Sequence, residues 1–274
     1  GACSRAEPIP LSGCNAFFAR ILDFFALSRE KVNFIGVDIA WGEKNPSGLC
    51  WLTGDVQRAE IREIAWVKPV EEIAEWIIQR AGGGCLAAVD GPIICPSGYR
   101  ECDRQVARDF ARFRAGPYPV NRQKAGKCIR LAEMLCQKGF TTNPEIEVQK
   151  PVRTVVEVYP HPAWVRFFHL TRIIPYKKGN REEKIKHLRR ALLLLRRHLP
   201  RFSPPLDMHH WHPRFTRLSQ QSTRQLKETE DWMDALFCAY LAFHYWYWGK
   251  EKWEIYGTQA SGYILIPKAL NWNA

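Results

Sequence analysis

Residues 230–240 read EDWMDALFCAY, and this stretch carries two aspartates at the start of an otherwise apolar run. Asp231 and Asp234 are three residues apart, so a helix places both carboxylates on one face. One interpretation is the start of a helix, where acids are stabilised by the positive end of the helix dipole. This explains Asp234 less well, because the apolar residues after it predict burial, and a partly buried acid needs a partner. The alternative is a site completed by carboxylates from other parts of the chain.

The composition is that of one large soluble domain. The chain has 274 residues, of which 46% are hydrophobic and 25% charged, which is enough apolar material for a core. No apolar stretch approaches the ~20 residues of a membrane-spanning helix, so we expect no membrane partner. Nine cysteines without a Cys-x-x-Cys pair favour a reducing, cytoplasmic location. A net charge of +12 favours a polyanionic partner without identifying it.

Two parts of the chain differ in pattern. Residues 1–31 contain an amphipathic stretch and are predicted to form an appended helical segment. Residues 32–274 are predicted to form a single domain, with a helical insertion at about 161–229. Nothing in the sequence indicates an oligomeric state.

The domain begins with short apolar stretches separated by turn residues. They predict three antiparallel strands at 34–40, 49–53 and 59–66. Asp38 is the only charged residue of the first strand, in a position where an unpaired charge is expensive. Its presence there needs a reason.

Two later strands also carry an acid. A helix beginning at Pro69 is followed by residues 85–90, which read as a buried parallel strand ending in Asp90. Glu157 lies in the next apolar stretch, at 155–160. Acids at the carboxyl ends of parallel strands face the crevice where α/β proteins bind ligands. A salt bridge or a turn hydrogen bond explains any one of the three acids equally well, so the prediction of a site depends on their number.

The order of these elements is that of a ribonuclease H-like fold, and the spaced motifs make the resemblance specific. Together they resemble an uncharacterised family of predicted ribonuclease H-like nucleases, domain of unknown function family 429, over about residues 34–267. The Asp-x-x-Asp-Ala at 231–235 also resembles that of Holliday-junction resolvases in the same superfamily. The motifs are GVDIAW at 36–41, VDGP at 89–92, RECD at 100–103, EVYP at 157–160, KKGNR at 177–181, EDWMDAL at 230–236 and GYILIP at 262–267.

The resemblance implies an α/β fold with a mixed five-stranded sheet, in which three antiparallel strands are followed by parallel strands and helices flank the sheet. It also implies Glu157 as a fifth catalytic candidate beside four metal-binding catalytic acids, Asp38, Asp90, Asp231 and Asp234. Two features depart from the family pattern. Gly91 stands where relatives often have a small residue such as Ala, and a long His- and Arg-rich segment precedes the last helix.

Oxygen ligands without His or Cys suit Mg²⁺ or Mn²⁺ rather than zinc. Two such ions about 4 Å apart could activate water and stabilise the leaving oxygen at phosphorus. The expected function is therefore a divalent-metal-dependent nuclease that hydrolyses phosphodiester bonds in DNA or RNA. The alternative is a non-catalytic nucleic-acid-binding or scaffold protein with the same fold. An actin-like ATPase is disfavoured, because its Gly-rich phosphate loops and duplicated domain are not found in the sequence.

Residues 181–201 predict an insertion helix with an apolar stripe and a basic opposite face. That face could follow a phosphate backbone, although a charged helix face is more often simply solvated. Lys178 is the sharper candidate. No role is predicted for His209, His210 and His212, which lack a matching second ligand cluster. The predicted substrate-binding residues are Arg100, Lys178, Arg181, Arg189, Arg190, Arg196 and Arg197.

Overall fold

The computed structural model describes residues 30–42, 45–96 and 98–270. The chain divides into residues 1–30 and residues 31–274. The predicted N-terminal helical segment lies almost wholly outside the described residues. The fold below is that of the second unit.

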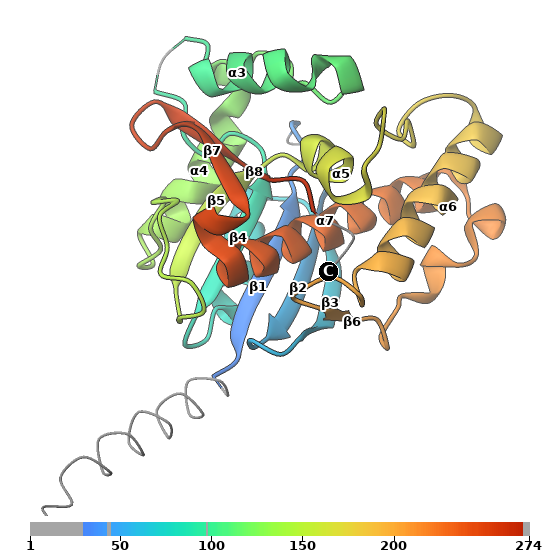
Figure 1. Cartoon of the computed structure of the whole chain (residues 1–274), viewed down its shortest axis with the longest axis horizontal. Coiled ribbons are helices and arrows are strands. Elements are labelled where there is room, and N and C mark those ends of the chain that lie inside the picture. Colours follow the sequence, from blue (N-terminus) through green and yellow to red (C-terminus); the bar gives the residue numbers. More distant parts are fainter. Residues whose placement is uncertain (1–29, 43–44, 97, 271–274) are drawn as a thin grey trace, which may run out of the picture. The chain divides into compact units, whose positions relative to one another are not determined.

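An eight-stranded mixed sheet forms the centre of this unit, in the order β6-β3-β2-β1-β4-β5-β8-β7 (Figure 1). The first three strands form an antiparallel meander, and β4 and β5 continue parallel to β1. The mixed α/β fold predicted from the sequence is therefore present. The strands are β1 (Val32–Asp38), β2 (Ser47–Gly54), β3 (Ala59–Val67), β4 (Cys85–Asp90), β5 (Arg153–Val158), β6 (Leu206–Asp207), β7 (Trp253–Thr258) and β8 (Gly262–Pro267).

The sequence predicted a sheet of five strands, whereas the described residues form a sheet of eight. The five expected strands are the central ones, β3-β2-β1-β4-β5. At one edge β6, from the insertion, pairs in parallel with β3. At the other edge β8 pairs with β5, and β7 pairs antiparallel with β8. The additional strands were missed because β6 has only two residues and the GYILIP stretch was recognised as a motif without being assigned to the sheet.

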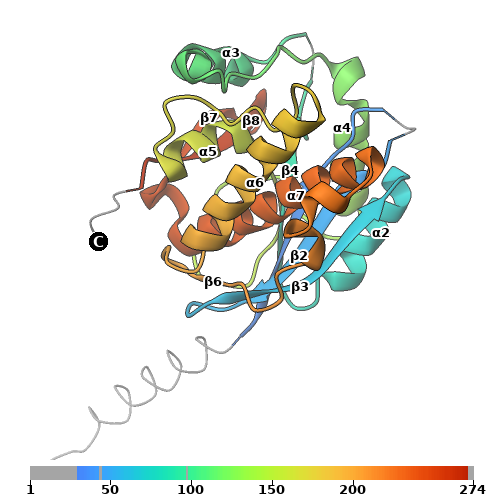
Figure 2. The same ribbon diagram turned by 90° about the vertical axis from the view of Figure 1, so that its right-hand side faces the viewer.

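Helices cover both faces of the sheet (Figure 2). α7 packs across β1, β2 and β4, whereas α2 and α4 pack together on the other face. No helix within the described ranges combines the length and apolarity needed to cross a bilayer. The helices are α2 (Val70–Arg80), α3 (Glu101–Phe110), α4 (Arg122–Cys136), α5 (Pro160–Phe168), α6 (Arg181–His198) and α7 (Thr223–Trp248), with short 3₁₀ turns η1 (Ala111–Phe113), η2 (Pro213–Phe215), η3 (Leu218–Gln220) and η4 (Gly249–Glu251).

The helix that bears the paired aspartates begins earlier than the sequence interpretation allowed. Ser222 caps α7, and its hydroxyl accepts from the backbone N–H of Gln225 while the Gln225 side chain accepts from the Ser222 N–H. Asp231 and Asp234 therefore lie about two turns and more inside the helix. The interpretation of these acids as helix-start residues was wrong, and they need another explanation.

α7 touches the sheet through backbone atoms. A Cβ atom at Gly36 of β1 would lie 2.0 Å from the carbonyl oxygen of Ala235, and one at Gly48 of β2 would lie 2.3 Å from that of Asp231. Real side chains do not tolerate such contacts, so glycine is required at both positions. The acid-bearing turn of α7 is consequently pressed against the ends of β1 and β2.

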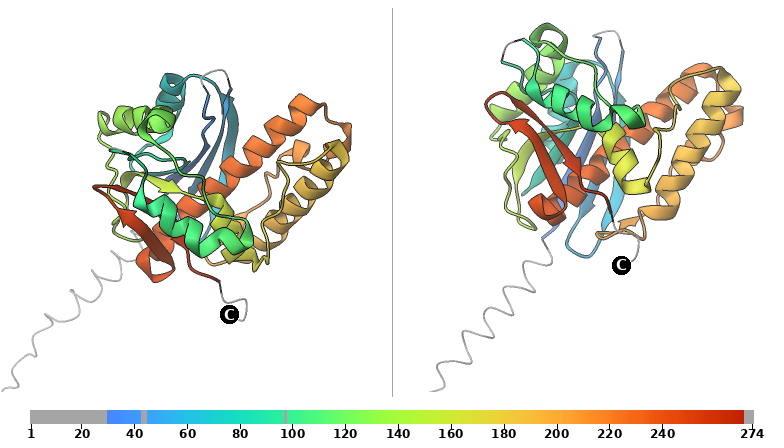
Figure 3. Two further views of the ribbon diagram at one scale, coloured as in Figure 1. Left: turned by 90° about the horizontal axis from the view of Figure 1, so that it is seen from above. Right: turned by 45° about the horizontal axis from the view of Figure 1, so that its top comes forward.

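The insertion and the C-terminal strands surround this centre. α5 and α6 pack against α7, and α3 lies beside β7 and β8 (Figure 3). A capping box fixes the start of α6, where Asn180 and Glu183 each accept from the backbone N–H of the other.

Candidate functional site

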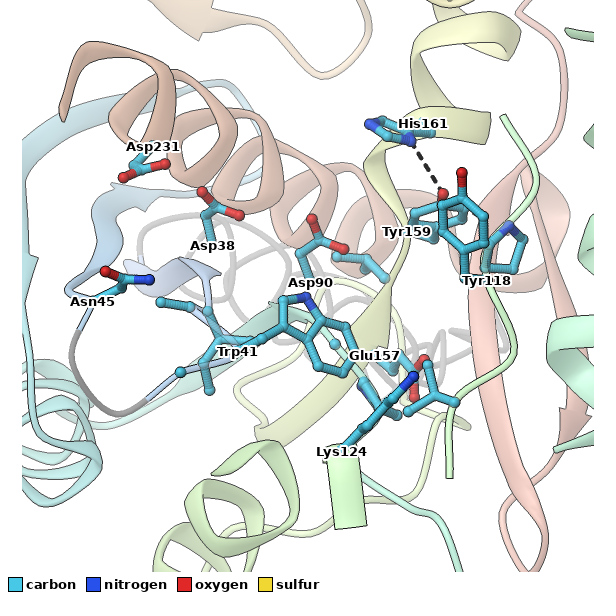
Figure 4. A pocket seen from close by; sticks show the side chains of 18 of the residues that line it. Asp38, Trp41, Asn45, Asp90, Tyr118, Lys124, Glu157, Tyr159, His161 and Asp231 are labelled. Carbon is cyan, nitrogen blue, oxygen red and sulfur yellow. Dashed lines mark hydrogen bonds between the residues drawn. The ribbon is translucent and has the colours of Figure 1, made fainter. Parts of the chain in front are cut away.

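Four of the five predicted acids line one cavity of about 840 Å³, and three of them, Asp38, Asp90 and Asp231, form a group (Figure 4). Asp38 and Asp90 are the last residues of β1 and β4, two adjacent parallel strands. Their carboxylates therefore lie side by side at the carboxyl ends of the two strands. Asp231 joins them because its backbone contacts Gly48, the residue that pairs with Asp38.

Asp234, the fourth acid, lies deeper. It is 1% exposed and does not line the cavity. Its Oδ1 accepts a hydrogen bond of 2.7 Å from the hydroxyl of Tyr176, and its Oδ2 lies 2.7 Å from Nζ of Lys177. Lys177 lines the cavity instead, with 38% of its side chain exposed. Lys177 thus pairs with the buried Asp234 and also forms part of the cavity lining.

Asp231 has partners of its own. Lys227 forms ion pairs with both Asp231 and Glu230, the latter at 3.1 Å. The indole N–H of Trp66 donates to Oδ2 of Asp231 at 3.3 Å. These contacts orient the Asp231 carboxylate and partly neutralise its negative charge.

The protonation of the cluster follows from crowding and burial. Burial raises the pKa of Asp38 well above its usual value; Lys177 lowers it, and Asp234, Asp90 and Asp231 raise it further. Burial likewise raises the pKa of Asp90 to about 7, against the opposing effect of Lys177. Burial lowers the pKa of Lys177, but Asp234 and Asp38 more than compensate and raise it well above the usual value. The cluster therefore favours additional positive charge, as protons or as a cation.

A divalent cation fits the chemistry of these donors. Among the described residues, no three His, Cys, Asp or Glu side chains already surround a common point. However, Asp38, Asp90 and Asp231 offer only oxygen atoms to the cavity, and a lysine ammonium already lies among them. Oxygen donors of this kind match Mg²⁺ or Mn²⁺. These three aspartates are the residues that would hold such an ion.

Glu157, the fifth acidic candidate, lies in the cavity wall in a separate ion pair. Its Oε2 and Oε1 accept from Nη1 and Nη2 of Arg100 at 2.6 and 2.7 Å. Nη2 of Arg100 also donates to Oδ1 of Asp103 at 2.6 Å, and the three side chains are 2%, 1% and 4% exposed for Arg100, Asp103 and Glu157. We call these three residues the arginine triad. Arg100, predicted to bind substrate, holds two acids of the protein itself.

The other predicted basic residues lie outside the cavity lining. Lys178 is exposed and follows Lys177. The guanidinium of Arg181 donates to the backbone carbonyl of Gln221 at 2.5 Å, which joins the start of α6 to the loop before α7. The remaining four residues are exposed on α6: Arg189, Arg190, Arg196 and Arg197.

Sequence reasoning missed several cavity residues. Nδ1 of His161 lies 3.0 Å from the hydroxyl of Tyr159 (Figure 4), and burial lowers the pKa of His161 to about 4, so this imidazole is neutral at pH 7. The only available signal for Lys177 was the KKGNR motif, which does not tell which of two adjacent lysines faces inward. Further lining residues outside the prediction are Trp41, Trp66, Tyr118, Lys124, Arg224 and Lys227.

One family comparison covers this site. The model of the family described as "Protein of unknown function (DUF429)" matches residues 36–252. The matched range includes Asp38, Asp90, Asp231 and Lys177, and it ends before β7. No curated protein matches the sequence.

Proposed function

The chain belongs to the DUF429 family, whose function is unknown, and from its site we propose that it is a divalent-metal-dependent nuclease with a ribonuclease H-like fold. One observation carries the proposal. Asp38, Asp90 and Asp231 come from two adjacent strand ends and from a helix, and they face the same large cavity. Convergent carboxylates of this kind are the ligands that hold catalytic Mg²⁺ or Mn²⁺ beside a phosphate.

The topology supports the fold assignment. The five central strands have the order β3-β2-β1-β4-β5, with an antiparallel meander followed by parallel strands. An acid-bearing helix then lies across β1 and β2. Both features agree with the ribonuclease H-like pattern that the sequence motifs resemble, with β6, β7 and β8 as additions at the edges.

Each residue of the site has a distinct role in this proposal. Asp38, Asp90 and Asp231 bind the cation, and Lys227 and Trp66 keep the Asp231 carboxylate oriented. Lys177 neutralises Asp234 and presents the exposed part of its side chain to an incoming phosphate. A cation held there would supply Lewis-acid chemistry at the phosphate and would lower the pKa of a bound water molecule.

A non-catalytic nucleic-acid-binding protein is the second candidate. The observation that favours it is the ammonium of Lys177, which already supplies positive charge to Asp234, Asp38 and Asp90. If this ammonium takes the place of the cation permanently, the acids stabilise the fold without supporting hydrolysis.

The test is cleavage of labelled single-stranded and duplex DNA and RNA with Mn²⁺ and with EDTA. We expect cleavage that needs the metal and is lost in Asp90→Asn. Asp207→Asn is the matched control, because this aspartate lies on β6 outside the cavity lining. Both variants are purified in the same way, which excludes a contaminating nuclease. Binding of the panel without cleavage by the wild type would favour the non-catalytic protein, and neither binding nor cleavage would favour a small phosphoester as substrate.

A further inference from the structure

Two aromatic side chains of the cavity are largely exposed to solvent. Trp41 is 53% exposed and Tyr118 is 87% exposed, and both line the cavity (Figure 4). Among the described residues, the other large hydrophobic side chains with comparable exposure are Tyr99, Val148 and Leu193, none of which lines it. Large rings lose favourable burial when they remain in water. Two of them at one cavity indicate a surface that a ligand covers.

The two rings are presented by different loops. Trp41 lies three residues after Asp38, in the connection between β1 and β2. Tyr118 stands between Pro117 and Pro119, before α4. Proline fixes its own φ angle and restricts the residue before it. The backbone that presents Tyr118 is therefore stiffened before any ligand arrives, which lowers the entropy lost on binding.

Positive charges accompany the rings. Lys124, an exposed residue in the first turn of α4, lines the cavity together with Lys177 and Arg224. Arg224 is 80% exposed in its side chain, and its guanidinium lies 5.6 Å from the centre of the Trp66 ring. Exposed rings, cations and three aspartates therefore line the same cavity. Proteins that bind single-stranded nucleic acid use this combination, with rings stacking on bases and cations contacting phosphates.

We propose that Trp41 and Tyr118 stack on unpaired bases, and that the ligand of the cavity is single-stranded DNA or RNA. The inference rests on the proposed nuclease function and narrows its substrate. A base within a duplex is covered on both faces by its neighbours, and exposing it costs a few kcal/mol per base. Stacking on Trp41 and Tyr118 therefore selects a strand that is already unpaired, whose backbone then passes the aspartates.

The test measures binding in EDTA, where no metal supports cleavage. An oligonucleotide carrying 2-aminopurine, whose fluorescence falls on stacking, is titrated with wild type, Trp41→Leu and Tyr118→Leu. Tyr99→Leu is the matched control, because Tyr99 is 64% exposed but does not line the cavity. We expect each cavity variant to bind the single strand at least about fivefold more weakly, since one base stack contributes about that much. The control should bind like the wild type, and Trp41→Phe should restore most of the affinity and quenching.

Duplex binding and cleavage separate this inference from the proposed function. A blunt duplex of the same sequence should bind wild type and both leucine variants equally.

Equal single-strand affinity in wild type and both leucine variants, or no nucleic-acid binding at all, would overturn the inference. Unchanged cleavage of the single strand by the leucine variants, measured below the dissociation constant of the wild type, would overturn stacking while keeping the nuclease. Quenching by a wild type that cuts nothing with Mn²⁺ would support stacking and reject the nuclease. Circular dichroism of each variant checks that the fold is kept.

Discussion

Two groups of acids border the same cavity, and their charges are neutralised in different ways. In the arginine triad, both oxygens of Glu157 are occupied by one guanidinium, and all three side chains are at most 4% exposed. The second group, which we call the aspartate cluster, consists of Asp38, Asp90, Asp231 and Asp234. Its main positive partner is Lys177, whose side chain is 38% exposed. A planar guanidinium saturates a carboxylate with two parallel hydrogen bonds, whereas an ammonium is a single movable charge.

The comparison teaches that an acid at the end of a buried strand is not by itself a functional acid. Glu157 and Asp90 occupy neighbouring strand ends, since Glu157 pairs with Val89. They differ in burial and in the positive partner, which is the Arg100 guanidinium for Glu157 and the Lys177 ammonium near Asp90. We therefore propose a structural role for the arginine triad and a catalytic role for the aspartates, and each prediction below tests that division.

The largest difference should appear in cleavage. Asp38→Asn removes a proposed cation ligand and should lower the cleavage rate by more than about 100-fold, because even partners behind metal ligands cost 10- to 100-fold. Glu157→Gln should keep most of the rate at a temperature where it is folded, because its oxygens face Arg100. Single-turnover kinetics with Mn²⁺ measure both. A Glu157→Gln variant as inactive as Asp38→Asn would place Glu157 among the catalytic groups.

The loss of stability, in contrast, should be larger when the arginine triad is broken than when the partner of the aspartates is removed. Arg100→Met leaves two buried carboxylates without their partner and should lower the free energy of unfolding by about 3–5 kcal/mol. Lys177→Met should cost less, because the Tyr176 hydroxyl still donates to Asp234 and the Lys177 side chain is itself 38% exposed. Mn²⁺ should restore part of the loss. Urea unfolding followed by circular dichroism, with and without Mn²⁺, measures both variants. Rescue of Arg100→Met by Mn²⁺ would contradict the division.

Metal binding should also appear as stabilisation of the wild type. At a Mn²⁺ concentration 100 times the dissociation constant, the free energy of unfolding should rise by about 2.7 kcal/mol, because the ion binds only the folded cluster. Asp38→Asn should show little of this increase, while Glu157→Gln should show all of it. Melting temperatures measured against Mn²⁺ concentration provide the comparison. Equal increases in wild type and Asp38→Asn would mean that the ion binds elsewhere.

The last prediction concerns pH, where the change in stability over a single pH unit is small. Burial raises the pKa of Glu157 from its usual value of 4.5 to about 8, despite Arg100. The folded state then binds this proton more tightly than the unfolded state, so stability is highest below about pH 4.5 and falls as pH rises to about 8. One group contributes at most about 1.4 kcal/mol per pH unit. Urea unfolding in EDTA should show a shallower decline for Glu157→Gln than for wild type, with the same-sign contribution of Asp90 remaining in both. Identical slopes would show that Glu157 does not titrate in this range.

The sequence predicted the central strands well, because their apolar runs and turn residues are local signals. Asp38 and Asp90 were found for the same reason: each is a charge at the end of an apolar strand. The start of α7 was misplaced because its first two turns are polar, and the interpretation relied on the apolar run that follows. Ser222 and Gln225 form a capping box, a local signal that was present but not used.

The charge partners could not be predicted from local patterns. Arg100 and Glu157 are 57 residues apart, and their pairing depends on how α3 meets β5. Lys177 and Lys178 are adjacent, and only the tertiary path decides that Lys177 reaches Asp234. Trp41 and Tyr118 lie on separate loops whose common cavity exists only in the folded chain. Long-range contacts of this kind are a property of packing rather than of spacing.

The glycine contacts of α7 have a consequence for how the family can vary. Gly36 and Gly48 fix the distance between helix and sheet by backbone contact, so larger residues there would displace the acid-bearing turn as a whole. A homologue could keep every aspartate and still lose the geometry through one added methyl group. Whether a homologue keeps this site therefore depends on Gly36 and Gly48 as well as on the aspartates.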